Sequence, residues 1–241
     1  MTTGSKITLG ISILLIVYVV AQYFRTRHYI NIGVPLAARA VAYEQHPAEP
    51  TSHILVIGDS TAVGTGADTP AESTAGLLGH DYPEADIVNR GVNGARLADL
   101  STSFVEFDDQ EFDLVLVQIG GNDVWHFTRF TDIEDSLNNV LADATRVGKH
   151  VMIMHGGDFA SAKALPLGTR WLFSWRSAKL RELYQRVVPE YGASYVDVWH
   201  ANDNKPDRAA AFYAADNFHP SSSGYQDWYE QIKLKLPTVA H

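Results

Sequence analysis

Residues 53–60 read His-Ile-Leu-Val-Ile-Gly-Asp-Ser, a short apolar run that ends in Gly58-Asp59-Ser60. A bounded apolar run of this length is typical of a buried strand, and Gly, Asp and Ser are common turn residues. A serine at a sharp turn after a buried strand can present its hydroxyl at the edge of a sheet, as nucleophilic serines do elsewhere. The stretch predicts a strand, a turn and a candidate nucleophile at Ser60, while an ordinary loop would have the same composition.

The same pattern recurs along the chain and indicates the fold class. Four further apolar runs are expected to be strands, at Ala85–Val88, Leu114–Ile119, His150–Met154 and Ser194–Val198. Helical spacing of apolar residues is present in three segments: from a capping box at Thr131 and Glu134 to Val147, over Trp171–Val188, and over Tyr225–Leu236. Alternating strands and helices predict an α/β fold, a three-layer αβα sandwich with a five-stranded parallel (flavodoxin-like) sheet that binds ligands at the carboxyl ends of its strands.

An uncharged apolar run precedes this region and predicts one N-terminal transmembrane helix. From Ile7 to Phe24 the 18 residues carry no charge, and in a helix they span roughly 27 Å of a hydrocarbon core about 30 Å thick. Tyr18, Tyr23 and Phe24 at the far end resemble an interfacial aromatic belt, which favours an uncleaved single-pass anchor over a cleaved signal peptide. A buried core helix is disfavoured because the run has no polar face.

The chain is therefore expected to have three parts. Residues 1–28 are the membrane anchor or signal segment, residues 29–51 are a linker with a short helix around Ala37–Tyr43, and residues 52–241 are one domain. The positive charges on the two sides of residues 7–24 nearly balance, so they do not determine the orientation. We expect the domain on the exported (periplasmic or extracellular) side.

Composition excludes several kinds of chemistry. The chain has no cysteine, which excludes thiol catalysis, disulfides and cysteine-ligated metal sites. Its 19 Lys and Arg against 28 Asp and Glu give a formal net charge of −9, which argues against sequence-independent binding to nucleic-acid phosphates. The oligomeric state is not indicated.

Four polar or glycine-rich blocks follow predicted strands or precede the last helix: Gly58-Asp59-Ser60, Asn89–Gly94, Gly120-Gly121-Asn122-Asp123 and Asp216-Asn217-Phe218-His219-Pro220. Asp216 and His219, three positions apart, can place a carboxylate against one imidazole nitrogen while the other nitrogen faces a nucleophile. In this order the blocks resemble the SGNH hydrolase (GDSL esterase/lipase) family from about Ile54 to Tyr225. The third block is especially similar to the thioesterase/lysophospholipase branch.

The resemblance implies a serine esterase or acylhydrolase that works through an acyl-serine intermediate without a metal or organic cofactor. Ser60 would be the nucleophile, His219 the general base and then acid, and Asp216 the residue that orients His219. The oxyanion hole would consist of the backbone N–H groups of Ser60 and Gly94 and the side-chain amide of Asn122.

Two neighbouring features of the blocks lie outside this set of roles. Asp59 and Asp123 are expected to hold loops through hydrogen bonds to the backbone. Thr61-Ala62 stands where family members often have Leu-Ser, which puts in doubt only the packing on the substrate side.

Three other interpretations fit part of the same residues. A nucleotide-binding loop at Gly58–Gly66 lacks the Lys-Ser/Thr pair that a P-loop requires. A metal hydrolase could use Asp216 and His219, with His126 or His155, but has no close third ligand in the sequence. A catalytically silent, membrane-tethered binding domain is disfavoured because all three triad residues are present.

The sequence says less about the substrate. The segment Phe159–Trp175 is expected either to form an apolar wall or lid for an acyl chain, or to pack a helix on the sheet. Lipid-like or other small-molecule acyl esters and thioesters are the expected substrates, and acetylated carbohydrate is the alternative. The family resemblance does not choose between them, because the same catalytic site serves lipases, thioesterases and deacetylases.

Overall fold

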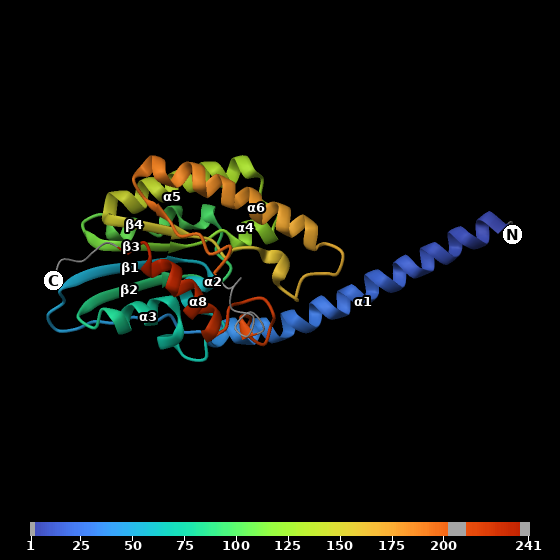
Figure 1. Cartoon of the computed structure of the whole chain (residues 1–241), viewed down its shortest axis with the longest axis horizontal. Coiled ribbons are helices and arrows are strands. Elements are labelled where there is room, and N and C mark those ends of the chain that lie inside the picture. Colours follow the sequence, from blue (N-terminus) through green and yellow to red (C-terminus); the bar gives the residue numbers. More distant parts are fainter. Residues whose placement is uncertain (1–2, 202–210, 237–241) are drawn as a thin grey trace.

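Five parallel strands form the central sheet of the computed structural model, which describes residues 3–201 and 211–236. The strands are β1 Ser52–Gly58, β2 Ala85–Gly91, β3 Phe112–Gln118, β4 Gly148–Met154 and β5 Ser194–Tyr195. Their order in the sheet is β2-β1-β3-β4-β5, and every neighbouring pair is parallel (Figure 1). The predicted five-stranded parallel sheet is confirmed, and each predicted run lies on or overlaps a strand.

The strand order places a crevice beside β1. From β1 the chain moves to β2 on one side, and it later returns to β3 on the other side of β1. In sheets of this kind ligands bind where the strand order reverses, outside the carboxyl ends of the strands. The turns that follow β1 and β3 carry Ser60 and Asn122, so the topology brings the first and third sequence blocks to this point.

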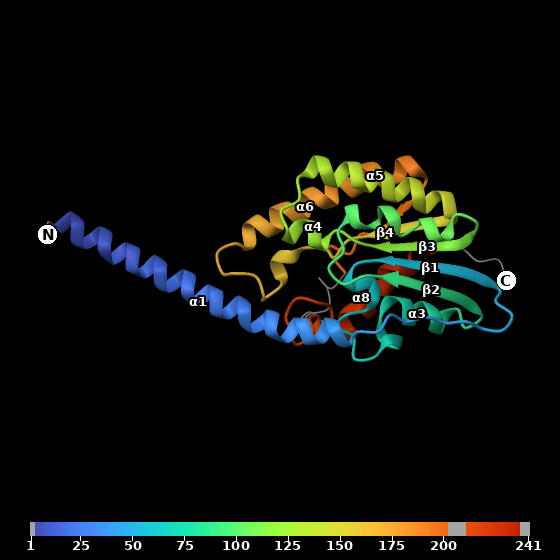
Figure 2. The same ribbon diagram turned by 180° about the vertical axis from the view of Figure 1, so that it is seen from behind.

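Alternate residues of the central strands face two different layers of helices. The covering helices are α3 Thr74–Asp81, α5 Phe130–Val147, α6 Arg170–Val187 and α8 Ser222–Lys233. Leu55 packs in a core with α5 and α6, whereas the next residue, Val56, packs in a core with α3 and α8. The two layers lie on opposite faces of the sheet (Figures 1 and 2). Because both faces are covered, β1 and β3 are nearly continuous apolar runs.

Short helices connect these elements. They are α2 Ser60–Val63, α4 Gly121–Trp125 and the 3-10 turns η1 Pro70–Glu72, η2 Leu97–Thr102, η3 Val105–Phe107, η4 Phe159–Ser161 and η5 Val188–Tyr191. The predicted capping box at Thr131 and Glu134 is wrong. Helix α5 already begins at Phe130, so both residues lie inside the helix, and the Thr131 hydroxyl bonds to Asp132.

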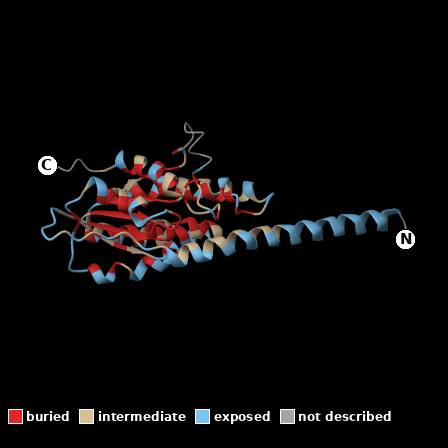
Figure 3. Ribbon diagram, turned by 90° about the horizontal axis from the view of Figure 1, so that it is seen from below, coloured by how far each residue is buried: buried red, intermediate tan, exposed pale blue. Residues whose placement is uncertain are grey.

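The N-terminal helix extends far beyond the predicted apolar run. Helix α1 covers Thr3–Arg39, 37 residues, and none of them is buried. Its N-terminal part projects away from the sheet, while its C-terminal part lies along the domain and is partly covered by it (Figure 3). The helix is long and apolar enough to cross a membrane, a property that a signal sequence shares.

The segment of residues 29–51, which the sequence predicts to be a linker, is helical in its first part. Helix α1 continues into this segment to Arg39, and the short helix expected at Ala37–Tyr43 is only its last turn. Pro35 removes one helical hydrogen bond, but the helix continues because one face of it is half-buried against the domain. Beyond the helix, Gln45 forms an antiparallel bridge with β2.

Candidate active site

Ser60 is presented by a tight turn at the carboxyl end of β1. Gly58 has a φ of +148°, and a Cβ there would lie 1.9 Å from the carbonyl oxygen of Gln118, so only glycine fits. Asp59 caps α2, since its Oδ1 accepts hydrogen bonds from the backbone N–H and the hydroxyl of Thr61, both at 2.8 Å. Ser60 becomes the first residue of α2 and is 8% exposed.

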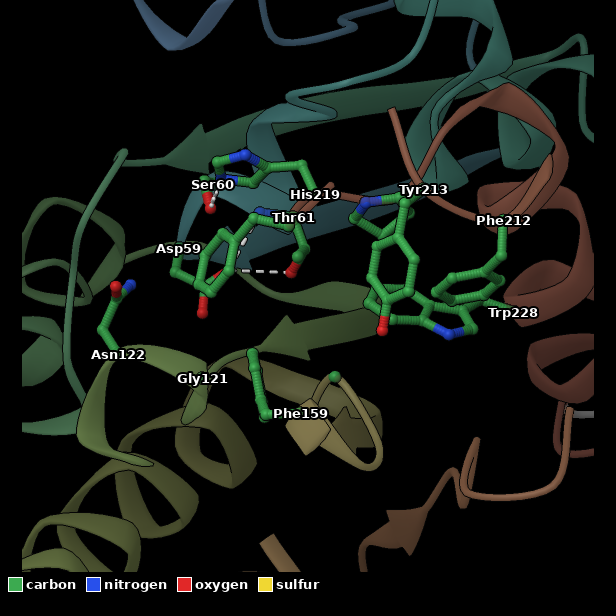
Figure 4. A pocket seen from close by; sticks show the side chains of 13 residues that line it. Asp59, Ser60, Thr61, Gly121, Asn122, Phe159, Phe212, Tyr213, His219 and Trp228 are labelled. Atoms are coloured by element: carbon green, nitrogen blue, oxygen red, sulfur yellow. Dashed lines mark hydrogen bonds between the residues drawn. The ribbon is translucent and has the colours of Figure 1, made fainter. Parts of the chain in front are cut away.

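The turn before α8 brings Asp216 and His219 together. Asn217 takes a φ of +52°, and Asp216 Oδ1 accepts hydrogen bonds from the backbone N–H groups of Phe218 and His219, both at 3.0 Å. Asp216 Oδ2 lies 2.6 Å from His219 Nδ1. His219 Nε2 lies 3.0 Å from Ser60 Oγ (Figure 4). The three residues predicted as a triad thus form one hydrogen-bonded chain.

Burial and hydrogen bonding oppose each other at the two aspartates of the site. Burial raises the pKa of Asp216, but the hydrogen bond from His219, the charge of His219 and two backbone N–H groups outweigh burial, and the pKa stays below its ordinary value. At Asp59 burial outweighs the hydrogen bonds from Thr61 and raises the pKa to about 6. Asp216 is therefore the better partner for a positively charged imidazole.

The other two residues expected at an oxyanion hole lie beside Ser60. Asn122 is in α4, after β3, and its amide extends toward the side of the pocket where Ser60 lies (Figure 4). Its Nδ2 donates a hydrogen bond to the carbonyl oxygen of Ala95 at 2.9 Å, which orients the amide; the second N–H of the group can serve a ligand. Gly94 has a φ of +84° and no atom within 4 Å of an added Cβ.

Two hollows meet at Ser60. The smaller has a volume of about 30 Å³ and is lined by aromatic residues beside the triad (Figure 4). The larger has a volume of about 280 Å³ and lies between the triad and α1. Ser60, Asn122, Phe218 and His219 line both hollows.

The segment Phe159–Trp175 divides between the two roles that the sequence left open. Phe159 lines the smaller hollow and Ala164 the larger one. Leu165 and Phe173 are buried in the core with α5 and α6. The segment therefore both packs a helix and contributes side chains to the site.

A buried arginine that the sequence does not single out supports the Asn122 turn. Arg176 of α6 is 6% exposed and donates hydrogen bonds to the carbonyl oxygens of Asp123, Val124 and Thr128. Asp123 in turn accepts a hydrogen bond from the backbone N–H of Leu97 at 3.0 Å, the loop-holding role expected for it. An arginine within a helical pattern resembles any solvated residue, so its role was not predictable.

The two histidines that are candidate metal ligands in the sequence have other surroundings. His155 is buried, its Nε2 lies 2.9 Å from the Tyr195 hydroxyl, and burial lowers its pKa to about 4. His126 lines the larger hollow. Within residues 3–201 and 211–236, no group of three or more His, Asp or Glu could hold a metal ion.

Solved structures of low sequence identity have the same fold. A catalytic mutant of an acetylxylan esterase from Geobacillus stearothermophilus is 20% identical, with a TM-score of 0.59, and the match covers 79% of this chain and 96% of that chain. Structures of that esterase include catalytic mutants with Ala in place of a Ser, an Asp or a His. A lipase from a goat rumen metagenome is 13% identical, with a TM-score of 0.60, and the match covers 76% of this chain and 97% of that chain.

An alpha/beta hydrolase from the metagenome of Lake Arreo, Spain, is 21% identical, with a TM-score of 0.56 and coverage of 77% of this chain and 94% of that chain. No curated protein sequence matches the chain. Residues 56–226, which include all the site residues described above, match the GDSL-like lipase/acylhydrolase family. This chain is therefore a member of the GDSL-like lipase/acylhydrolase family and a hydrolase that acts on ester bonds.

Proposed function

We propose that Ser60, His219 and Asp216 are the catalytic triad of a serine esterase. The observation that carries the proposal is the chain of contacts from Ser60 Oγ to His219 Nε2 at 3.0 Å and from His219 Nδ1 to Asp216 Oδ2 at 2.6 Å. In this arrangement His219 can take the serine proton while Asp216 stabilises the imidazolium that forms. The same residue types are replaced in the catalytic mutants of the acetylxylan esterase.

The reaction proceeds in two half-reactions. Ser60 Oγ bonds to the ester carbonyl carbon as its proton passes to His219 Nε2, and His219 then gives that proton to the leaving oxygen as the bond to the alcohol breaks. Water next loses a proton to His219 and attacks the acyl-serine, and the proton returns to Ser60 Oγ as the carboxylic acid leaves. A thioester would react in the same way, with sulfur as the leaving atom.

The negative charge that develops on the carbonyl oxygen needs preorganised donors. The backbone N–H groups of Ser60 and Gly94 and the free N–H of the Asn122 amide are proposed to supply them. Removing one such donor typically costs about 10²–10³ in rate. An exposed glycine at position 94 lets the substrate approach the backbone without a Cβ in the way.

Lipid-like or other acyl esters are the proposed substrates. The larger hollow supports this choice, because it extends from Ser60 between apolar side chains such as Trp125, Phe218 and Ile30. A deacetylase of acetylated carbohydrate is the second candidate. It is favoured by the smaller hollow, which at about 30 Å³ is much smaller than the hollow of about 280 Å³ beside α1, and by the acetylxylan esterase among the structural neighbours.

Helix α1 is proposed to act as an uncleaved single-pass membrane anchor, with the hydrolase domain on the exported side. The apolar part of the helix projects from the domain and none of its residues is buried, which is the arrangement that a bilayer would cover. Accessibility of the domain to protease in intact cells tests the side. Mass measurement of the purified protein tests whether the N-terminus is retained.

The esterase proposal is tested with a fluorophosphonate probe and a panel of esters and thioesters of increasing acyl length. The wild-type chain should be labelled and should hydrolyse members of the panel, while Ser60→Ala should do neither and should keep its melting temperature. Absence of Ser60-dependent labelling in folded protein would contradict the triad. A strong preference for acetate would favour the deacetylase.

A further inference from the structure

The larger hollow beside Ser60 has one wall that comes from the N-terminal helix. Residues of α1 line it along one helical face, and residues of the catalytic domain line it from the opposite side. The α1 residues are Thr26, Tyr29, Ile30, Gly33, Val34 and Ala37. With about 100° per residue, positions 26, 30, 33 and 37 lie on one face of a helix, so this part of α1 presents a continuous stripe to the site.

Contacts with the domain hold this stripe in place at the triad. A Cβ added at Gly33 would lie 3.1 Å from Asp216 Oδ2, so the helix backbone packs directly against the carboxylate that orients His219. Near the end of α1, the side-chain amide of Asn93, next to Gly94, donates a hydrogen bond to the carbonyl oxygen of Ala37 at 3.1 Å. The first contact reaches the proposed triad itself, and the second reaches the residue that precedes Gly94.

A second set of contacts holds α1 on the side that leads to the apolar run. The Arg25 guanidinium donates hydrogen bonds to the carbonyl oxygens of Leu165, at 2.5 Å, and Lys163. Gln22 Oε1 accepts a hydrogen bond from the backbone N–H of Leu167 at 2.8 Å. The helix is therefore fixed on both sides of the hollow and forms a defined wall.

The chemistry of this wall is apolar. Ile30 is 40% exposed and Val34 is 62% exposed, although both line a hollow whose opposite side includes Trp125, Phe218 and Ala164. His219 lies at the Ser60 end of the hollow, where an ester carbonyl would bind, and Thr26 and Tyr29 are the polar residues on the α1 side. Each methylene that leaves water for such a surface favours binding by about fourfold, so an aliphatic chain is the ligand that fits.

We propose that the Thr26–Ala37 segment of α1 is one wall of an acyl-binding cavity, and that Ile30 and Val34 determine which acyl chains the enzyme accepts. This inference rests on the proposed ester hydrolysis at Ser60. It makes the N-terminal helix part of the specificity site as well as a connection to a membrane. The acyl chain of a membrane lipid ester is the substrate class that this placement favours.

The test uses the full-length protein in detergent and p-nitrophenyl acetate, octanoate and dodecanoate. Ile30→Trp and Val34→Trp should each fill part of the cavity and lower kcat/KM on octanoate and dodecanoate by at least about tenfold, the equivalent of losing contact with about two methylenes. Acetate turnover should stay within about threefold, because the acetyl group does not reach this wall. Ile30→Ala and Val34→Ala enlarge the cavity and should shift the preference toward dodecanoate.

Asn31→Trp is the matched control, because Asn31 is exposed, lies next to Ile30 and is not part of the cavity lining. It should leave the chain-length profile unchanged. A profile that is the same in wild type, Ile30→Trp, Val34→Trp and both Ala variants would overturn the proposal, as would an equal loss on all three esters in the Trp variants. Fluorophosphonate labelling of Ser60 distinguishes failure of this proposal from failure of the proposed esterase. An unchanged chain-length profile with intact labelling refutes only the acyl-binding wall on α1, whereas absent labelling of the wild type refutes the esterase.

Discussion

Replacing Asp216 with asparagine should move the imidazole proton of neutral His219 from Nδ1 to Nε2. Asp216 Oδ1 accepts two backbone hydrogen bonds at 3.0 Å, from Phe218 and His219, and Oδ2 faces His219 Nδ1 at 2.6 Å. In Asp216→Asn the amide oxygen should keep the two backbone donors, because turning the NH₂ group toward them would leave both unsatisfied at about 1–3 kcal/mol each. The NH₂ group must then face His219 Nδ1.

An NH₂ group beside Nδ1 requires that Nδ1 accept a hydrogen bond, so the imidazole proton moves to Nε2. Nε2 lies 3.0 Å from Ser60 Oγ and, once protonated, cannot take the serine proton. We therefore expect kcat to fall by about 10⁴, the loss typical of a triad forced into the wrong tautomer, equivalent to about 5 kcal/mol of transition-state stabilisation. The melting temperature should change by only about 2–4 °C, because a charged hydrogen bond is exchanged for a neutral one.

Ester turnover, fluorophosphonate labelling rate and thermal unfolding measure these effects together. Asp158→Asn is the matched control: Asp158 also accepts a backbone hydrogen bond, from Ala160 at 2.9 Å, but lines neither hollow. A loss of less than about tenfold in kcat for folded Asp216→Asn, or an equal loss in Asp158→Asn, would refute the tautomer argument.

The same variant also changes the acid side of the stability profile. The pKa of Asp216 is lowered in the folded chain, so its carboxylate contributes stability that is fully present above the unfolded value of about 4 and is lost as the pH falls below it. Asp216→Asn cannot make this contribution. Urea unfolding at several pH values should therefore show a shallower loss of stability in the variant below about pH 4.

Three other substitutions test separate parts of the site. Asn122→Ala should lower kcat by about 10²–10³ while fluorophosphonate labelling stays detectable, and unchanged kcat would remove the amide from the oxyanion hole. Burial raises the folded pKa of Asp59 to about 6, so the wild type loses stability as the pH rises from about 4 to about 6. In Asp59→Asn the free energy of unfolding should therefore increase by up to about 3 kcal/mol near pH 8 and change little near pH 4. An equal increase at both pH values would contradict the raised pKa. Arg176→Met removes three hydrogen bonds to carbonyl oxygens and should lower the melting temperature by about 6–12 °C, so an unchanged value would show that other groups hold the Asn122 turn.

Much of the fold was predictable from local patterns. A buried strand needs apolar residues on both faces, and the turn after it needs residues such as Gly58 that tolerate unusual backbone angles. Both requirements appear within a few consecutive residues, so the five strands and the blocks at their ends could be identified. The chain order of those blocks then indicated the family, and the structure brings Ser60, Asp216 and His219 into contact as expected.

The predictions that failed concern segments whose conformation depends on distant contacts. The prolines between residues 35 and 50 are typical of a linker. Helix α1 nevertheless continues through Pro35, because the C-terminal part of the helix packs on the catalytic domain. Thr131 and Glu134 have the spacing of a capping box, but the helix begins before them. Arg176 shows no sign in the sequence of the carbonyl oxygens that it binds.

The residue content sets the chemistry available to this protein: with no cysteine in the chain, the candidate nucleophile is a serine oxygen, and an apolar helix precedes the domain. The contact between this helix and the triad, in contrast, depends on the folded arrangement. Gly33 and Asp216 are far apart along the chain, and their contact depends on the path of everything between them. Local residue patterns carry no record of such a contact, because it arises from packing between surfaces that form only when the sheet and its helices are assembled.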